Sequence, residues 1–211
     1  AKGYGEPRSA KEFSELAQWV NYDGHRSLFE SRSQNRKGLL MWMSHSCWPS
    51  MVWQTYDYYF EPTAAYFAIK KASEPLHIQW NPVTDEVEVV NYSGGNRKGL
   101  TAKAQVLNMD ASVAWEKEVA TDSNEDTTNK CIRLEFPDNL SKVHFIKMVL
   151  TENGKVISEN FYHRSLEENN YQDLRNLPKV ALKSDVTTNK GTDGNWNGTV
   201  VIENTTSTPA L

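Results

Sequence analysis

VHFIKMVLTENGKVISENFYH, residues 143–163, contains the clearest structural signal in this 211-residue chain. Two stretches rich in apolar residues, 143–150 and 155–163, flank the dipeptide Asn153-Gly154. Asn-Gly is favoured in the tight turn of a two-residue β-hairpin, because both positions of that turn need positive φ. The sequence therefore predicts an antiparallel hairpin here, which needs further strands beside it to be stable.

Further stretches with alternating apolar and polar residues precede this hairpin. They lie at 76–80, 86–89, 100–106 and 131–136, separated by breaks at Pro82, Gly94-Gly95, Asp110 and Pro137-Asp138. About seven short strands within roughly ninety residues are typical of an immunoglobulin-like antiparallel β-sandwich. We expect this sandwich to occupy residues 76–165.

The pattern before the sandwich is helical. Residues 9–12, Ser-Ala-Lys-Glu, have the form of a capping box, in which a serine and a glutamate satisfy the first free N–H groups of a helix. Apolar residues then recur at helical spacing, which predicts one long helix over about 10–34, or two helices joined near Gly24.

A second helix is predicted after an apolar run and an aromatic loop. Leu39–Met43 has no polar alternation, which suits a strand buried on both faces. Pro62 fits the first position of a helix that continues to Pro75. Helix, strand, long loop and helix form one repeat of an α/β architecture.

The C-terminal residues predict a linker and one more strand pair. Residues 166–177 have the composition of a linker, and strands are expected at 180–187 and 199–202. The residues from 178 onward are too few for an independent core. Either they pack on the sandwich, or they begin a further β-domain that is cut short. We predict the second alternative.

Composition excludes several classes of function. The net charge of −4, with 24% charged residues, provides no basic excess for nucleic acid. No apolar run approaches the ~20 residues that span a bilayer, so we expect no membrane span. Cys47 and Cys131 are expected to be independent thiols, and no cofactor or metal site is predicted. The histidines without metal-like spacing are His25, His77, His144 and His163.

Residues 40–79 combine several motifs at fixed spacing. They are Trp42, Trp48-Pro49-Ser50, Tyr56–Tyr59, Ala65–Phe67, Lys70–Ala72 and Glu74–His77. Together they resemble the end of the catalytic barrel in glycoside hydrolase family 2, most closely its exo-β-D-glucosaminidase (exo-chitosanase) branch, with β-mannosidases and endo-β-mannosidases next. Phe29–Ser33 and Ile202–Ala210 also look like parts of that branch, so the resemblance covers most of the chain.

The resemblance implies a fold and a domain layout. The chain would be an α+β fragment, in which residues 1–75 are the last helix-strand-helix of a (β/α)8 barrel. Residues 76–165 would be the immunoglobulin-like sandwich, 166–177 a linker, and 178–211 the truncated start of a second β-sandwich.

The resemblance also implies an activity for the parent chain. Family members are retaining hydrolases that use two carboxylates about 5–5.5 Å apart. Both carboxylates are expected on barrel strands before residue 1, so this chain alone should be inactive. Its expected partners are the remainder of the parent chain and, through the parent barrel, a carbohydrate substrate.

The expected contribution of this chain to the site is the rim of the pocket. Barrel enzymes build their sites from the loops that follow the strands. By likeness, Trp48 would stack on the sugar or form a wall of the pocket, and His45 would offer a hydrogen bond to a sugar hydroxyl. Ser46 lies between them as a third substrate-binding candidate. Relatives often have Asn in place of His45.

Neighbouring residues have simpler interpretations. Core packing is the preferred role for Trp42, because it lies within the apolar run. Asp57 and Glu61 could suggest a catalytic pair, but Asp57 is better explained as an acceptor of hydrogen bonds from phenol and backbone groups.

Three functional hypotheses follow. The first is an exo-acting β-glycosidase that releases β-linked glucosamine from chitosan-like oligomers, and the second is a relative of β-mannosidases or endo-β-mannosidases. The third is a carbohydrate-binding or purely structural module, of which the structural role is favoured because the predicted strands show no exposed aromatic row. A polymeric substrate cannot enter a cell intact, so the expected location is secreted or periplasmic.

Overall fold

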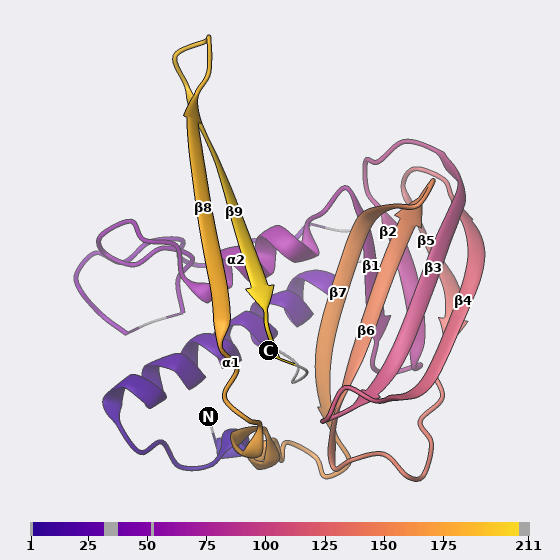
Figure 1. Ribbon diagram of the computed structural model, residues 1–211, viewed down its shortest axis with the longest axis horizontal. Coiled ribbons are helices and arrows are strands. Elements are labelled where there is room, and N and C mark those ends of the chain that lie inside the picture. Colours follow the sequence, from indigo (N-terminus) through magenta and orange to yellow (C-terminus); the bar gives the residue numbers. More distant parts are fainter. Residues whose placement is uncertain (1, 32–37, 52, 207–211) are drawn as a thin grey trace.

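The computed structural model describes residues 2–31, 38–51 and 53–206. Within these residues, two α-helices lie beside a β-sandwich (Figure 1). A hairpin near the C-terminal end projects beyond the rest of the molecule (Figure 1). The short 3-10 helices η1 (Lys2–Tyr4) and η3 (Gln172–Asn176) complete the regular structure.

Helix α1 (Ala10–Ser31) confirms the first predicted helix as far as the described residues allow. The Ser9 hydroxyl accepts the backbone N–H of Glu12 at 3.1 Å, which is one half of the capping box. The Glu12 carboxylate accepts the N–H of Arg8 rather than that of Ser9. The helix runs through Gly24 without interruption, so the alternative of two joined helices is wrong. The predicted end beyond residue 31 lies outside the described residues.

The strand predicted at Leu39–Met43 is not present, so the helix-strand-helix order is wrong for this chain. This stretch is irregular, and the side chains of Leu40 and Trp42 are 99% and 80% exposed. A parallel strand depends on backbone hydrogen bonds to neighbours on either side. No strand in the described part of the chain pairs with Leu39–Met43. The apolar pattern alone is therefore insufficient to form it.

Helix α2 (Ala64–Ala72) is shorter than predicted. Its N-cap is Thr63, so Pro62 precedes the helix and is not its first residue. Pro62 instead forms an isolated antiparallel bridge with Tyr56. The helix buries Ala65, Ala68 and Ala72, whose small side chains allow close packing against α1.

Seven antiparallel strands between Leu76 and Ser165 confirm the predicted sandwich. They are β1 (Leu76–Asn81), β2 (Glu86–Asn91), β3 (Arg97–Asn108), β4 (Val113–Ser123), β5 (Thr127–Arg133), β6 (Val143–Glu152) and β7 (Lys155–Ser165). One sheet has the order β1-β2-β5 and the other β4-β3-β6-β7 (Figure 1). Strands β4 and β7 are the two edges of the larger sheet.

The hairpin that the sequence predicted most clearly is formed by β6 and β7. Its two turn residues, Asn153 and Gly154, have φ of 51° and 76°. This pair of positive angles fits the two-residue turn that matches the twist of antiparallel strands.

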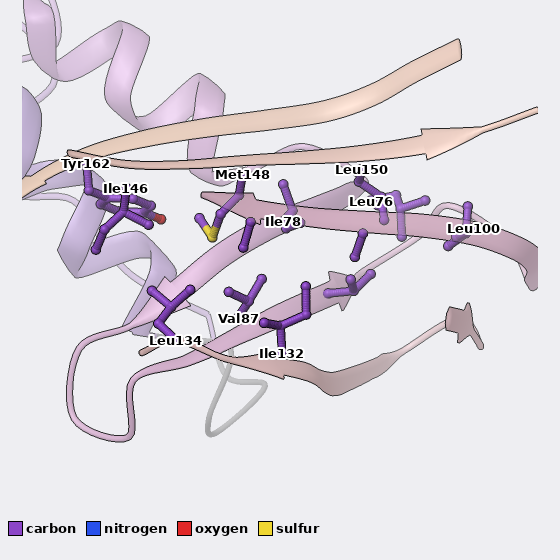
Figure 2. Close-up of a cluster of buried hydrophobic side chains, with 13 residues drawn as sticks. Leu76, Ile78, Val87, Leu100, Ile132, Leu134, Ile146, Met148, Leu150 and Tyr162 are labelled. Carbon is purple, nitrogen blue, oxygen red and sulfur yellow. The ribbon is translucent and has the colours of Figure 1, made fainter. Parts of the chain in front are cut away.

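The core lies between the two sheets. Figure 2 shows Ile78 and Val87 of the smaller sheet facing Met148 and Leu150 of the larger one. The alternating residues of β3, Leu100 among them, contribute side chains that are fully buried. The apolar residues of the predicted period-two alternation thus face inward and form this core.

The stretch predicted as a linker, 166–177, is partly ordered against the N-terminal residues. The backbone N–H of Tyr171 donates to the carbonyl of Gly3 at 2.7 Å. The rings of Tyr4 and Tyr171 stack with their centroids 5.1 Å apart. The two segments therefore hold each other beside α1.

Strands β8 (Leu182–Lys190) and β9 (Trp196–Asn204) form a two-stranded antiparallel hairpin in which every residue is exposed. Residues directly opposite each other share a face. One face carries Val186 opposite Val200, with Ile202 and Trp196 along the same side. The other face is mostly polar. The hairpin is amphipathic, and its apolar face is open.

Candidate functional site

The predicted site residues lie in the irregular segment between the two helices, residues 38–63. The Ser44 carbonyl holds this segment closed, since it accepts the backbone N–H of Tyr56 at 2.9 Å and the hydroxyl of Thr55 at 2.8 Å. Thr63 then bonds back to the Thr55 carbonyl at 2.9 Å. The loop is thereby fixed immediately before α2, and its tip is left free to carry side chains.

His45 is held in a defined orientation by this loop. Its ring stacks on Phe60, with the centroids 4.3 Å apart and the planes 15° from parallel. Its Nε2 lies 3.3 Å from the Tyr58 carbonyl, which can only accept a hydrogen bond, so Nε2 carries the proton.

Trp48 and Ser46 differ in their accessibility. Trp48 is 69% exposed and presents an aromatic face to solvent. Ser46 is buried, and its hydroxyl oxygen accepts from the Ser50 hydroxyl at 3.4 Å. Ser46 also lines a cavity of about 560 Å³ between the loop and α1, together with Asn21 and His25. The structure thus brings the three predicted residues into one loop, with Ser46 on its inner side.

Several other aromatic residues of the loop are exposed, and Trp42 is more exposed than the sequence predicted. Trp42 is not a core residue: its carbonyl accepts from the Trp53 indole N–H at 3.3 Å, and its own ring is exposed. Tyr59 and Phe60 are exposed as well. The side chains of Trp42, Tyr59 and Phe60 therefore lie at the surface of the molecule.

Asp57 has the structural role that the sequence predicted. One carboxylate oxygen, Oδ1, accepts the backbone N–H of Tyr59 at 2.8 Å and that of Glu61 at 2.9 Å. Such a carboxylate stabilises the turn at the tip of the loop. Glu61 belongs to the same turn through its backbone N–H, and the geometry of Asp57 is that of a cap and not of a catalytic acid.

A second polar cluster, which sequence reasoning missed, lies between α1 and the sandwich. Glu30 of α1 is buried, and its Oε1 lies 3.1 Å from Nε2 of His77 and 2.9 Å from Nδ2 of Asn160. The Tyr162 hydroxyl is 2.9 Å from both Glu30 oxygens. The other ring nitrogen of His77, Nδ1, lies 3.0 Å from the Glu74 carboxylate. The cluster therefore joins the helical segment to β1 and β7.

Burial, hydrogen bonds and neighbouring charges shift the pKa values of two groups in this cluster, Glu74 and Tyr162. Burial opposes ionisation of Glu74, but hydrogen bonds from His77, Lys71 and Ser158 outweigh it and lower its pKa to about 2. Burial also raises the pKa of Tyr162 well above its usual value, and the neighbouring Glu30 charge adds to this effect. Tyr162 is thus a permanent hydrogen-bond donor.

No group of three or more histidine, cysteine or carboxylate side chains with metal-binding geometry is found in the described ranges. Cys47 and Cys131 are free thiols, as predicted. None of the helices in residues 2–31, 38–51 and 53–206 is both long and apolar enough to cross a bilayer.

Comparison with known proteins identifies relatives over nearly the whole chain. No protein-family model matches. An exo-β-D-glucosaminidase from Streptomyces avermitilis is 31% identical over 239 residues, which cover 99% of this chain and 26% of that protein. The crystal structure of an exo-chitosanase from Amycolatopsis orientalis superposes with a TM-score of 0.88 at 29% identity, covering 97% of this chain and 27% of that one.

A mannosidase is also similar. A mannosylglycoprotein endo-β-mannosidase from Lilium longiflorum is 29% identical over 168 residues, covering 75% of this chain and 18% of that protein. The chain spans about a quarter of the length of the glucosaminidase relatives that it matches.

Proposed function

We infer that the chain is a segment of the exo-β-D-glucosaminidase branch of glycoside hydrolase family 2, and we propose that its parent protein is a retaining exo-β-glycosidase. The proposed reaction releases β-linked glucosamine from chitosan-like oligosaccharides. The observation that supports it is the similarity to exo-β-D-glucosaminidases over 97–99% of the chain, in sequence and in fold.

The proposal assigns the two catalytic carboxylates to the rest of the parent chain. The acidic residues of segment 38–63 are Asp57 and Glu61, and Asp57 caps the turn at the tip of the loop. We therefore expect this chain alone to hydrolyse nothing, and we expect the remainder of the parent as its partner.

The proposed layout follows the domain boundaries expected from the sequence. Residues 1–75 would complete a (β/α)8 barrel, and Leu39–Met43 would become its last strand once parallel neighbours are supplied. Residues 76–165 would be an immunoglobulin-like sandwich, followed by a linker at 166–177. The open apolar face of β8 and β9 supports 178–211 as the start of a second β-domain.

The loop after the proposed last strand would form one side of the sugar pocket. Trp48 is suited to stack on the apolar face of a pyranose ring, because it is exposed on an anchored loop. His45 would present its ring to a hydroxyl group, and Ser46 would shape the loop from its inner side.

The sandwich is proposed to be structural. All residues from 76 to 165 are described, and the exposed large hydrophobic side chains among them are Val83, Val113 and Val156. A sugar-binding platform needs exposed aromatic rings. A carbohydrate-binding role for the sandwich is therefore the weaker alternative, and retention of residues 76–165 on a chitosan affinity gel would support it instead.

The parent protein assayed on chitosan oligomers and on an aryl β-mannoside tests the proposal. We expect glucosamine release with retained anomeric configuration, and little activity on the mannoside. The similarity to the lily endo-β-mannosidase supports the second candidate, mannosidase activity, which the opposite substrate preference would establish. Inactivity on both substrates would reject both candidates. The proposed location, secreted or periplasmic, is tested by fractionating the native host.

The rim assignment has its own test in the parent protein. Trp48→Ala is expected to lower kcat/KM about tenfold, the loss expected for one aromatic stacking contact. Tyr59→Ala is the matched control, because Tyr59 is also 69% exposed on the same loop. Equal losses in both variants would contradict the assignment of Trp48.

A further inference from the structure

The attachment of α1 to the sandwich depends on charged groups to an unusual degree. The buried residues of α1 are Arg26, Phe29 and Glu30, so two of the three are ionisable. The apolar core cluster of the described residues draws its members from Leu76 to Tyr162 and includes none from either helix. Polar contacts therefore make up much of the connection between the helical segment and the sandwich, beside the ring contact of Trp19 with His163.

His77 lies at the centre of this connection and is fully buried. Its two ring nitrogens face two different carboxylates, Glu30 at 3.1 Å and Glu74 at 3.0 Å. Carboxylates only accept hydrogen bonds, so both contacts are satisfied only when both nitrogens carry protons. The two carboxylate contacts thus favour the imidazolium form, while the Asn160 amide nitrogen also lies 3.3 Å from Nε2.

The acidic and basic side chains near His77 add to the need for its second proton. The carboxylates that contact His77 are Glu30 of α1 and Glu74 just after α2, and Lys71 bonds Glu74 in turn. Arg26 of α1 bonds Asn160 and Asp23, and Glu88 of β2 bonds Gln79. Strand β7 contributes the uncharged groups Ser158, Asn160 and Tyr162, and its His163 lies 3.4 Å from Asp23 as a second titratable contact with α1. Without the His77 proton, the Glu30 and Glu74 carboxylates lose the cation between them. An opposite charge removed from such a low-dielectric site leaves the remaining carboxylates poorly compensated.

We propose that Glu30, His77 and Glu74 form a pH-dependent latch, which holds α1 on the sandwich while His77 is doubly protonated and loosens it when His77 loses a proton. The latch is independent of the glycosidase assignment, because it depends only on contacts within this chain. Its release would let the helical segment move relative to the sandwich while the sandwich core stays folded.

The direction of the pH effect follows from the His77 environment. Burial disfavours the imidazolium, but the two carboxylates outweigh burial and raise the pKa of His77 above its ordinary value of 6.5. The folded pKa is raised, so the stabilisation is complete below pH 6.5. It is lost as the pH rises through the folded pKa.

Hydrogen exchange of the 211-residue chain, resolved by NMR, tests the latch together with a titration of the His77 ring signals. Above pH 6.5, we expect the opening constant of α1 amides to rise about tenfold per pH unit, the slope for one linked proton, after correction for the intrinsic pH dependence of exchange. Amides of β3 and β6 should remain protected. The rise should end where the His77 ring finishes titrating.

Two variants separate the latch from a general effect of pH. His77→Gln should abolish the pH dependence of α1 opening, whereas His25→Gln, on α1 but outside the cluster, should leave it unchanged. Glu74→Gln should move the His77 midpoint downward, which keeps the proposal testable if His77→Gln does not fold. An α1 opening constant independent of pH in the unmodified chain, or the same slope in His77→Gln, would overturn the latch.

Discussion

Replacing Glu30 by alanine should strongly weaken the attachment of α1. The carboxylate accepts from Asn160 at 2.9 Å and from His77 at 3.1 Å, and the Tyr162 hydroxyl lies 2.9 Å from both of its oxygens. Removing one partner of a buried pair costs about 3–5 kcal/mol, because the remaining charge is left uncompensated. At pH 6, where His77 is protonated, we expect Glu30→Ala to destabilise α1 by about this amount.

Urea unfolding measures this change, with the far-UV helix signal followed because α1 is the element that Glu30 attaches. The matched control is Glu15→Ala on the same helix, whose ion pair with Lys11 is solvent-exposed. The control should change the free energy of unfolding by no more than about 0.5 kcal/mol. A difference between the two variants below about 1 kcal/mol would show that the buried cluster contributes little to the attachment of α1.

Three further changes test other parts of the structure. Ile78→Ala removes a fully buried core side chain and should cost about 2–5 kcal/mol in urea unfolding, whereas Val83→Ala, at a 90% exposed position, should be nearly neutral. Gly154→Val should cost about 1–2 kcal/mol, because the residue has φ of 76° while a Cβ there would meet no neighbouring atom. The lowered pKa of Glu74 means that its stabilisation is present above pH 4.5 and is lost as the pH falls through about 2. Glu74→Gln should therefore show a flatter decline in stability over that range of pH, and an unchanged decline would contradict the assigned pKa.

The sandwich could be predicted because its burial follows the sequence period. Leu100, Ala102, Ala104 and Val106 alternate with polar residues, and all four are buried. The sequence of β4 shows no clear alternation of apolar and polar residues, because β4 is an edge strand that contains exposed charged residues. Strand boundaries at such edges depend on pairing partners more than on the local sequence.

The position of β5 shows the same dependence. The alternating stretch 131–136 predicted a strand, but β5 ends at Arg133 and begins earlier, at Thr127. Its polar first half pairs with β2, so backbone hydrogen bonds define the strand where side chains give no signal. Leu134 is buried beyond the strand end.

The candidate sites were predictable to different degrees. Trp48 and its neighbours were chosen because a motif at fixed spacing surrounds them, and their role in sugar binding stays a prediction. The cluster around His77 had no such signal, because Glu30 and Asn160 lie 47 and 83 positions away from it in the chain. Only the packing of α1 across β1 and β7 brings these residues together. The prediction of a strand at Leu39–Met43 failed for a related reason. An apolar pattern does not show whether other strands are present to pair with it.

The hairpin of β8 and β9 has a consequence for any thermodynamic study of this polypeptide. A two-stranded ribbon with every residue in water is marginally stable on its own. Its amides should exchange quickly with solvent, and its residues should add little to the cooperative transition or to the denaturant dependence of unfolding. The unfolding transition that calorimetry measures on the 211 residues would thus be that of the sandwich and its attached helices. The C-terminal hairpin would contribute little to it.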